Sequence, residues 1–542
     1  MTASGQTGVT LGLERIVRFL AHVLPSDPRD KLRVVHVAGT NGKGSVCALV
    51  SEALTAAGYN VGTFNSPHFL EPHDAVRIQN EAIPAGEYAR LQTWIRTLDS
   101  TQTNKLSIFE QTTVLALWWF AQCNVDVAVV EVGMGGLRDA TNVFSSVRNG
   151  IGSLVQCICP VDEDHLGMIG NNIEEIALEK SGIMRPGSWI VVANQERSEA
   201  FHKIRQEAHR TSPGRIINVR RQPTYDIHVP NFVIDTTDVP GRVRPPAELP
   251  SWATFKGTGK RCLRVKYPPS PETYLKSSGS AKPKESRESK EPTKSTKTEV
   301  DLPLELPGYY QAGNASVAFY ALDVLRTHYG FTRLTDAAIQ VGFQNVRWPG
   351  RLSWLNIAHR RASIVSPTDV QSGSESPNDT APERLYEWVL ADGAHNEPAA
   401  VELRKYVDTT LRRISQQRYI RMARSRHSEN VCVRWVVGFT QGKDVSAILA
   451  RLAQPGDEVW AVPFAQPKEM PWITCERPEQ IAQTARACSE GVRVEAFDCL
   501  ADAVDRLAAC SADTFLNVVC GSLYLVANVF REFQLEPFPE IT

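Results

Sequence analysis

Apolar runs of strand length alternate with segments of helix length along the first two hundred residues. The strand-like runs lie at 32–38, 126–133, 152–159 and 189–193, and helix-length segments such as 46–57 and 109–123 separate them. Runs that are apolar at consecutive positions are typical of parallel strands with both faces covered. The pattern therefore predicts an α/β fold with a parallel sheet between layers of helices.

A second alternating series begins after Arg351. It predicts strands at 388–391, 434–439, 458–464, 492–497 and 515–520, with helices at 398–411, 478–488 and 500–510. Proline and glycine interrupt the chain at 347–351, between the two series. We therefore expect an N-terminal domain of residues 1–347 and a C-terminal, Rossmann-like α/β domain of residues 348–542.

Two stretches differ from the rest of the chain in composition. Residues 268–298 are rich in Pro, Ser, Lys and Glu, and residues 366–382 are rich in Ser, Pro, Asp and Thr. Such segments bury too little apolar surface to offset the entropy lost on ordering. We predict a disordered insertion at about 268–298 and a loop insertion at about 360–386.

The overall charge is balanced, with 59 Lys and Arg against 60 Asp and Glu among 542 residues. Nothing in this balance favours nucleic acid or an anionic membrane as a partner. The chain also lacks a run of 18 apolar residues and an apolar signal segment at its start. We expect a monomeric cytoplasmic protein with small-molecule partners, no nucleic acid and no membrane, and a mitochondrial location remains open.

Eleven cysteines are scattered along the chain, and several lie in apolar strand or helix patterns. Cys157 and Cys159 form a C-x-C pair without the second pair that a structural zinc site needs. This distribution of cysteines predicts a reducing compartment and no structural zinc.

The segment 36–45, His-Val-Ala-Gly-Thr-Asn-Gly-Lys-Gly-Ser, follows the first apolar run and precedes a helix pattern. Its glycines let backbone N–H groups face phosphate oxygens, while Lys43 supplies a positive charge and Ser45 a hydroxyl for Mg²⁺. The spacing departs from G-x-x-x-x-G-K-[ST], because Gly44 separates the lysine from the serine. The alternatives are a nucleoside triphosphate site and a glycine-rich turn that binds nothing.

Three further polar positions follow buried patterns in the first domain. Glu131 ends an apolar strand, where a carboxylate can hold Mg²⁺, although a glutamate paired with a lysine would look the same. His165 follows the next strand as a candidate metal ligand or phosphate contact, and a lone histidine is more often simply packed or solvated. Lys180 lies in the last turn of a predicted helix, where the helix dipole alone favours a lysine.

Polar groups also lie at strand ends in the second half of the chain. The segments 308–314, 392–396, 437–444 and 520–524 each place Gln, Asn, Asp, His, Lys or Ser beside a strand or helix end. Open α/β sheets bind ligands at the carboxyl edge of their strands. Several such ends in one domain indicate a site, although an isolated Gln or Asn could equally cap a helix.

Taken in order, these segments resemble the folylpolyglutamate synthase and dihydrofolate synthase family, the folate branch of the Mur ligase superfamily. The resemblance spans nearly the whole chain and is most like a fungal dihydrofolate synthase. It rests on residues 11–16, segment 36–45 (called the phosphate loop here), Ser66-Pro67-His68, 131–136 with 139–142, 164–167, 179–183, 308–314, 348–351, 392–396 and 521–524.

The resemblance implies a Mur-ligase-like fold and an ATP-dependent ligase. In that reaction ATP phosphorylates a pteroate-type carboxylate, and the amine of L-glutamate attacks the acyl phosphate. The expected catalytic residues are Lys43, Lys180 and His395, and Lys180 matches a lysine that is carbamylated in the family. The expected ATP-binding residues are Gly39, Thr40, Asn41, Gly42, Lys43, Gly44, Ser45, Asn314, Arg351 and Asp392. The expected ligands of the Mg²⁺ cofactor are Ser45, Glu131, His165 and Lys180, and the expected substrate contacts are Ser66, His68, Asp74 and Arg77.

The chain departs from the family pattern in the length between Asn142 and His165, in the insertions near 268–298 and 360–386, which compact bacterial relatives lack, and in two shorter motifs. Asp74 and Ala75 stand where relatives usually carry Glu-Arg, on a loop beside the pterin side of the site. Asp164-His165 is followed directly by Leu166-Gly167, a shorter spacing than relatives show between the histidine and a Leu-Gly pair.

Two reactions share this scaffold. Asn41 in the phosphate loop and the long insertions favour dihydrofolate synthase, which joins L-glutamate to 7,8-dihydropteroate. The alternative is folylpolyglutamate synthase, which extends the glutamate tail of tetrahydrofolate. A catalytically inactive nucleotide-binding relative and a simple P-loop nucleotidase are more remote alternatives.

Overall fold

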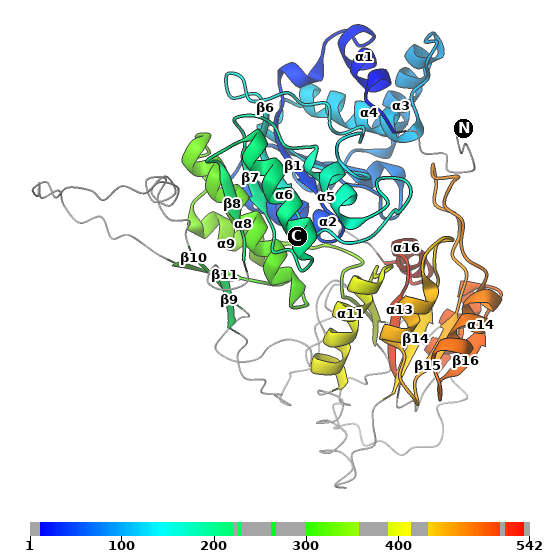
Figure 1. Ribbon diagram of the computed structural model, residues 1–542. Helices are drawn as coiled ribbons and strands as arrows, with labels where there is room; N and C mark the ends of the chain where they lie inside the picture. Colours follow the sequence, from blue (N-terminus) through cyan, green and yellow to red (C-terminus); the bar gives the residue numbers. More distant parts are fainter. Residues whose placement is uncertain are drawn as a thin grey trace, which may run out of the picture.

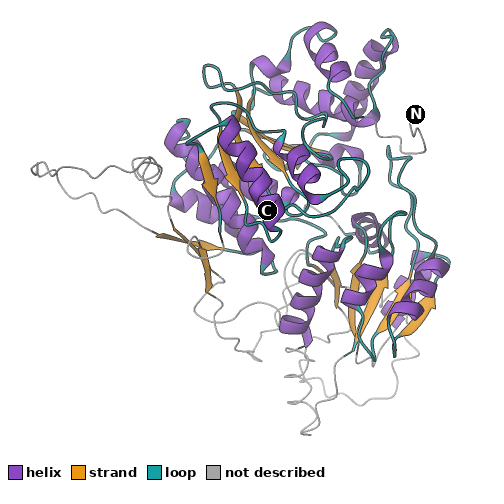
Figure 2. Cartoon of the chain, in the orientation of Figure 1, coloured by secondary structure: helices purple, strands orange, loops and turns teal. Residues whose placement is uncertain are grey.

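The computed structural model describes residues 11–220, 225–228, 262–266, 299–356, 388–412, 432–509 and 515–535. The predicted insertions at 268–298 and 360–386 lie outside these residues. The described chain forms two parallel-sheet units, one from the blue-to-green half of the sequence and one from the yellow-to-red half (Figure 1). Helices lie against both sheets (Figure 2).

The first unit, here called the N-terminal domain, is built on an eight-stranded sheet in the order β4-β3-β2-β5-β1-β6-β7-β8. Its strands are β1 (Arg33–Ala38), β2 (Val61–Phe64), β3 (Val76–Ile78), β4 (Glu81–Ala82), β5 (Val127–Glu131), β6 (Gly152–Ile158), β7 (Trp189–Val192) and β8 (Ile216–Asn218). All neighbours pair in parallel except β3 and β4, which form an antiparallel edge. Ligands of such sheets bind at the edge where the carboxyl ends of the parallel strands lie.

Helices cover this sheet on both faces, as the apolar runs predict. They are α1 (Glu14–His22), α2 (Lys43–Ala56), α3 (Ala85–Ser100), α4 (Ile108–Gln122), α5 (Ile173–Ser181), α6 (Ser198–Thr211), α8 (Tyr310–His328) and α9 (Asp336–Asn345). Successive residues of β1 face opposite layers: Val35 and Val37 pack with α2 and α8, while Val34 packs with α1 and α4. The first domain thus places β1, at the centre of the sheet, between two apolar layers.

The second unit, the C-terminal domain, contains a six-stranded sheet in the order β12-β13-β17-β14-β15-β16, in which only β12 is antiparallel to its neighbour. Its strands are β12 (Ser353–Asn356), β13 (Trp388–Ala391), β14 (Val433–Val437), β15 (Glu458–Ala461), β16 (Arg493–Ala496) and β17 (Leu516–Cys520). Its helices are α11 (Glu397–Tyr406), continued by the π-helical turn η5 (Val407–Arg412), α13 (Val445–Leu452), α14 (Pro478–Cys488), α15 (Leu500–Ala509) and α16 (Leu523–Glu532).

The strands and helices predicted from the apolar runs are confirmed, with ends that differ by a few residues. The pattern missed short elements, including β2, β8, β12 and the turns η1 (Pro28–Asp30) and η2 (Pro72–Ala75). It also missed a small antiparallel sheet of β9 (Tyr225–His228), β10 (Cys262–Lys266) and β11 (Glu299–Pro303), which packs Leu263 and Val300 into the same core as α8. In the part of the chain that the structure describes, no helix has the length and apolar character to span a bilayer.

Candidate active site

The phosphate loop connects the end of β1 to the start of α2. Gly42 directly precedes α2 in the left-handed conformation, with φ of 93°, which glycine adopts without strain. Gly39 also has a positive φ of 148°, and a Cβ there would lie 2.5 Å from the Cβ of Cys159. Both glycines are therefore required by the backbone path of the loop.

Thr40 and Asn41 hold the loop against the neighbouring strand end. Their backbone N–H groups both donate to the carbonyl of Pro160, at 2.8 and 3.3 Å, and the Thr40 hydroxyl bonds to the backbone of Asp162. We expected Thr40 and Asn41 among the ATP-binding residues. In this structure their amides shape the loop, and α2 begins at Lys43, so the N–H groups nearest the positive end of that helix belong to the residues from Gly42 onward.

Three predicted residues, Lys43, Glu131 and Lys180, meet at this loop. The Lys43 ammonium lies 4.0 Å from the Glu131 carboxylate, and the Lys180 ammonium donates to the carbonyl of Gly39 at 3.0 Å. Burial raises the pKa of Glu131, and the positive charge of Lys43 opposes that rise. Burial lowers the pKa of Lys180 to about 7, and the nearby charge of Lys43 acts in the same direction. Lys180 can therefore lose its proton near neutral pH. Carbamylation requires this uncharged form of the amine.

A buried chain of amides links helix α8 to the loop. Asn314 donates to the Gln311 side chain at 2.8 Å, and Gln311 donates to the Ser45 hydroxyl at 3.3 Å. The Asn314 amide also lies directly against Gly42, where a Cβ would clash with it. The predicted residues Ser45 and Asn314 are therefore brought together, through a glutamine whose importance the sequence did not single out.

The two domains meet beside the phosphate loop. Lys443 donates to Asp164 at 2.7 Å, and the His395 Nε2 lies 3.9 Å from the same carboxylate. Asn41 and Asn396 exchange amide hydrogen bonds of 3.3 and 3.4 Å across this interface. The carboxyl edge of the second sheet thus faces the phosphate loop of the first.

Both histidines of this region are neutral at physiological pH. Burial lowers the pKa of His395 to about 4, aided by the charge of Lys443, and burial likewise lowers the pKa of His165 to about 4. The Nδ1 of His395 donates to the carbonyl of Gly393 at 2.8 Å, because a carbonyl can only accept. The neutral His395 ring therefore presents Nε2 as a proton acceptor.

The Nε2 of His165 lies 3.8 Å from the carboxylate of Asp164, and the backbone of His165 is left-handed, with φ of 55°. The Leu166-Gly167 pair directly after His165 is not the pair that packs into the core. Leu166 is 54% exposed, whereas Ile169 is buried and Gly170 fits closely against the start of α5. The apolar-glycine pair that contacts the core is therefore Ile169-Gly170, three residues further along than Leu166-Gly167.

Asp392 and Arg351 lie at the connection between the domains. The Asp392 carboxylate is buried and accepts from the backbone N–H groups of Leu352 and Ala394, at 2.9 and 2.8 Å. Burial raises the pKa of Asp392, and the charge of Arg351 opposes the rise. Asp392 thus fixes the connecting segment, while Arg351 lines the adjacent pocket.

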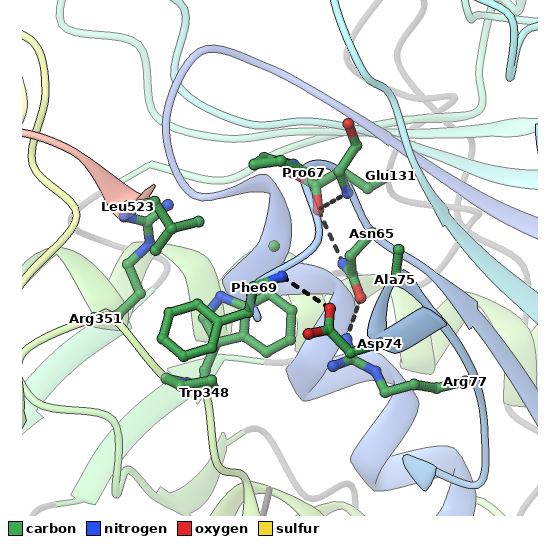
Figure 3. A pocket seen from close by; sticks show the side chains of 13 residues that line it. Asn65, Pro67, Phe69, Asp74, Ala75, Arg77, Glu131, Trp348, Arg351 and Leu523 are labelled. Carbon is green, nitrogen blue, oxygen red and sulfur yellow. Dashed lines mark hydrogen bonds between the residues drawn. The ribbon is translucent and has the colours of Figure 1, made fainter. Parts of the chain in front are cut away.

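This first pocket opens beside Glu131 (Figure 3). Gly44, Asn65, Ser66, Phe69, Arg77, Glu131, Trp348, Arg351 and Leu523 are among its lining residues. Asn65 joins two of the charged groups: it donates to Glu131 at 2.9 Å and accepts from Arg77. Asn65 is a site residue that the sequence reasoning missed, although it immediately precedes Ser66.

Asp74 has a structural role in the loop that borders this pocket. Its carboxylate accepts from the backbone N–H groups of Phe69, Leu70 and Glu71, at 2.8, 2.6 and 2.9 Å. Asp74 also lines the pocket, as do Ser66 and Arg77, which were expected in the same role. Contact of these three residues with substrate stays a prediction.

A second pocket lies on the other side of the same loop, and His68 faces it. Asn65, Ser66, Pro67 and Ala75 line both pockets, so the two adjoin. Four aromatic side chains line the second one, with Phe64, Tyr88 and Phe109 from the N-terminal domain and Trp472 from the C-terminal domain. The sequence did not single out these residues: Phe64, Tyr88 and Phe109 lie in strands or helices, where an aromatic residue is usually part of the core, and Trp472 lies in a loop.

No three His, Cys, Asp or Glu side chains within the described ranges cluster into a ready-made metal site. Glu131 and Ser45 instead offer isolated oxygen ligands beside the phosphate loop. Mg²⁺ is commonly held in this way, by one or two carboxylates together with substrate phosphates and water.

Comparisons with known proteins identify similar sequences and similar folds. Residues 379–532 match the family model "Dihydrofolate synthetase, C-terminal domain". A probable dihydrofolate synthetase of Schizosaccharomyces pombe is 29% identical over 97% of this chain and 99% of its own length. The dihydrofolate synthetase of Saccharomyces cerevisiae is 27% identical over 96% and 98%.

Solved structures share the fold. Escherichia coli FolC in complex with DHPP and ADP has a TM-score of 0.64 at 23% identity, covering 98% of this chain and 95% of that one. The Mycobacterium tuberculosis folylpolyglutamate synthase complexed with ADP and AMPPCP has a TM-score of 0.65 at 24% identity, with 97% and 96% covered.

The chain has the two-domain α/β fold of these solved structures, and its loop after β1 faces the domain interface. The expected fold class is confirmed. The expected resemblance to the folylpolyglutamate synthase and dihydrofolate synthase family is confirmed by the match of residues 379–532 and by the two fungal dihydrofolate synthetases.

Proposed function

We propose that this protein is a dihydrofolate synthase: an ATP- and Mg²⁺-dependent ligase that joins L-glutamate to 7,8-dihydropteroate. The observation that carries the proposal is the meeting of Lys43, Glu131 and Lys180 on one domain with His395 and Lys443 on the other. Its specificity for dihydropteroate rests on the two fungal dihydrofolate synthetases, which align with nearly the whole chain.

ATP is the phosphoryl donor in this proposal. The start of α2 and the Lys43 ammonium offer positive charge to the β- and γ-phosphates, while Asn314 lies against Gly42 of the loop and Arg351 lines the adjacent pocket. Charge on the transferred phosphoryl group is stabilised chiefly by such fixed positive groups. Lys43 is therefore the residue on which the phosphorylation step depends most.

The donor set beside the loop fits Mg²⁺. The Glu131 carboxylate is 5% exposed, with one oxygen bonded to Asn65 and the other facing Lys43, and the Ser45 hydroxyl belongs to the same loop. Ser45, Glu131 and His165 would hold the ion, and a carbamylated Lys180 would supply a carboxylate for a second one. When bound, the metal neutralises phosphate charge and fixes the phosphates in line with the acceptor.

The acceptor occupies the two adjoining pockets. Aromatic side chains suit a flat heteroaromatic ring, which they contact by stacking or edge-to-face packing. A pterin ring in the second pocket places the carboxylate of the acceptor towards the first, beside Arg351 and the phosphate loop.

The reaction then proceeds in two balanced steps. A carboxylate oxygen of the acceptor attacks the γ-phosphorus of ATP, and ADP leaves. The amine of L-glutamate attacks the acyl carbon, inorganic phosphate leaves, and the amine loses a proton. The neutral His395, with Nε2 free of the Gly393 carbonyl, is placed on the second domain to take that proton.

Domain contact protects the intermediate. An acyl phosphate is hydrolysed by water, so the site must exclude water before the intermediate forms. The hydrogen bonds of Asn41 with Asn396 and of Lys443 with Asp164 join the domains at the phosphate loop. These contacts between the domains therefore lie beside the position at which the acyl phosphate would form.

A product assay tests the proposal. Purified protein is incubated with ATP, Mg²⁺ and L-glutamate, with 7,8-dihydropteroate or tetrahydrofolate offered in parallel, and amide products are identified by mass spectrometry. Product from dihydropteroate alone supports the proposal. Product from tetrahydrofolate alone assigns the folylpolyglutamate synthase activity instead, and no product from either acceptor contradicts a ligase function.

A further inference from the structure

One segment of the C-terminal domain reaches over the second pocket of the N-terminal domain. This segment, residues 465–475, lies between β15 and α14 and is called the strap here. Both of its ends are fixed to its own domain: the Ala465 N–H donates to Asn528 at 2.6 Å, and Cys475 pairs with Thr440 as an isolated bridge. A Gln466 side-chain bond of 2.8 Å to the Pro471 carbonyl braces its turn. The strap therefore moves with the C-terminal domain.

The tip of the strap is held by the other domain through Glu469. Its carboxylate accepts a hydrogen bond of 3.1 Å from the Tyr88 hydroxyl and another from the Gln92 amide, and Arg96 lies 3.8 Å away. All three partners lie on α3. The Glu469 side chain is 22% exposed, so this contact is largely shielded from water. Charged acceptors form the stronger class of hydrogen bonds.

The backbone of Glu469 shows that the tip is positioned by tertiary contacts. Its φ is 61°, a left-handed conformation that a glutamate seldom adopts. The hydrogen bonds to α3 therefore hold Glu469 in a backbone conformation that its local sequence disfavours. Observed strain of this kind is concentrated at binding sites.

The strap also forms a wall of the aromatic pocket. Met470 and Trp472 line it from the C-terminal domain, while Phe64 and Phe109 line it from the N-terminal domain. The Tyr524 hydroxyl, on α16, donates to the Met470 sulfur at 3.4 Å and supports that side chain. Tyr88 takes part twice, since it lines the pocket and donates to Glu469. The pocket is therefore complete only when the two domains are together.

We propose that the strap is the outer wall of the acceptor site and that Glu469 is a positioning residue that couples acceptor binding to domain closure. The inference rests on the proposed function for the identity of the acceptor, a flat heteroaromatic carboxylic acid. Binding of its ring between Phe109 and Trp472 favours the closed arrangement, and the bonds of Glu469 to α3 hold the strap there.

The test compares kinetic constants of two variants with those of the wild type. Glu469→Gly removes the carboxylate at a left-handed position that glycine favours, so the backbone is not penalised. Tyr88→Phe removes only the hydroxyl. We expect the KM for dihydropteroate to rise about ten-fold in Glu469→Gly and about three-fold in Tyr88→Phe, with the KM for ATP within about two-fold of wild type.

The matched control is Arg90→Ala, which lies on the same helix α3 but pairs only on the surface, with Glu87. It should keep wild-type constants. The inference is overturned if Glu469→Gly, with wild-type thermal stability, keeps the wild-type KM for the acceptor. It is also overturned if the KM values for ATP and acceptor rise together, because that pattern reports general loosening of the domains.

A binding measurement separates this inference from the proposed function. Calorimetric titration of the full chain with pteroic acid requires no turnover. If the wild type forms no amide product, the proposed function fails, while a weaker affinity of Glu469→Gly than of wild type for pteroic acid still supports the strap. Equal affinities of the two proteins for pteroic acid contradict the proposed role of the strap, whatever the product assay shows.

Discussion

The Lys443 ammonium donates to the Asp164 carboxylate at 2.7 Å and thereby joins two strand ends from different domains. Asp164 is 11% exposed and Lys443 is 21% exposed, so water screens the pair only partly. Burial alone would raise the pKa of Asp164, but His165, in its protonated form, and the Lys443 ammonium outweigh that effect and hold the pKa well below its usual range. The pair fixes the second domain directly over the phosphate loop.

Removing this ion pair is predicted to impair closure. Lys443→Ala leaves a partly buried carboxylate without its closest cation, and breaking one member of such a pair is costly. We expect kcat/KM for ATP to fall by about ten-fold or more. Small-angle scattering with a non-hydrolysable ATP analogue should show a larger radius of gyration than for wild type.

Lys443→Arg is the control for that experiment, because it keeps the charge. Partial recovery of kcat/KM is expected. A Lys443→Ala protein with wild-type kcat/KM and an unchanged radius of gyration would contradict the closing role of the pair.

Lys43→Ala is predicted to abolish turnover without unfolding the protein. The Lys43 ammonium makes one bond of 3.3 Å, to the Thr40 carbonyl, and lies 4.0 Å from Glu131. These contacts contribute little to stability, whereas loss of a cation at a transferred phosphoryl group typically lowers kcat by about 10³-fold or more. Product formation and thermal unfolding measured together check both parts.

The exposed Lys31 supplies a surface control for that substitution. Lys31→Ala should retain wild-type turnover. If Lys43→Ala lost less than about ten-fold in kcat, the role assigned to the phosphate loop would be wrong.

Much of the fold was predictable because it depends on local patterns. Apolar runs such as 126–133 identify buried parallel strands, and the glycines around Lys43 mark the turn into α2. Short elements were missed because three or four residues, as in β8, carry too little periodicity to be distinguished from a loop.

The site was only partly predictable, since several of its contacts join distant residues. Lys443 and Asp164 are separated by 279 positions, and Tyr88 and Glu469 by 381. No local pattern reports such pairs. Asp74 shows a related limit: the sequence singles out an acidic residue in a substrate-side loop, but it does not reveal that the carboxylate accepts from three backbone amides of that loop.

Glu131→Gln is predicted to raise the Mg²⁺ requirement. The amide keeps the size of the side chain and can still accept from Asn65, but it loses the negative charge that a hard cation prefers. We expect the Mg²⁺ concentration for half-maximal activity to increase by about ten-fold, with a smaller change in the KM for the acceptor. Activity titrated against Mg²⁺ at saturating substrates measures this.

Glu81→Gln, on the exposed edge strand β4, is the control and should leave the titration unchanged. An unaltered Mg²⁺ requirement in Glu131→Gln would remove Glu131 from the metal site.

The last prediction concerns stability in acid and depends on His36. This residue of β1 is buried, and its Nε2 lies 2.9 Å from the Thr141 hydroxyl. Burial lowers its pKa from 6.5 to about 3. Between these values the unfolded chain binds a proton that the folded chain does not, so the stabilisation is complete above pH 6.5 and is lost as the pH falls towards 3. The expected slope from this group approaches about 1.4 kcal/mol per pH unit.

Urea unfolding of the wild type and of His36→Gln between about pH 5 and pH 7 isolates this contribution. The variant lacks the titrating ring, so its free energy of unfolding should depend less steeply on pH, even though the substitution lowers stability at every pH. Comparing slopes rather than absolute values removes that general loss. Equal slopes in the two proteins would show that His36 has the same pKa in the folded and unfolded chains, and would contradict the lowering of its pKa by burial.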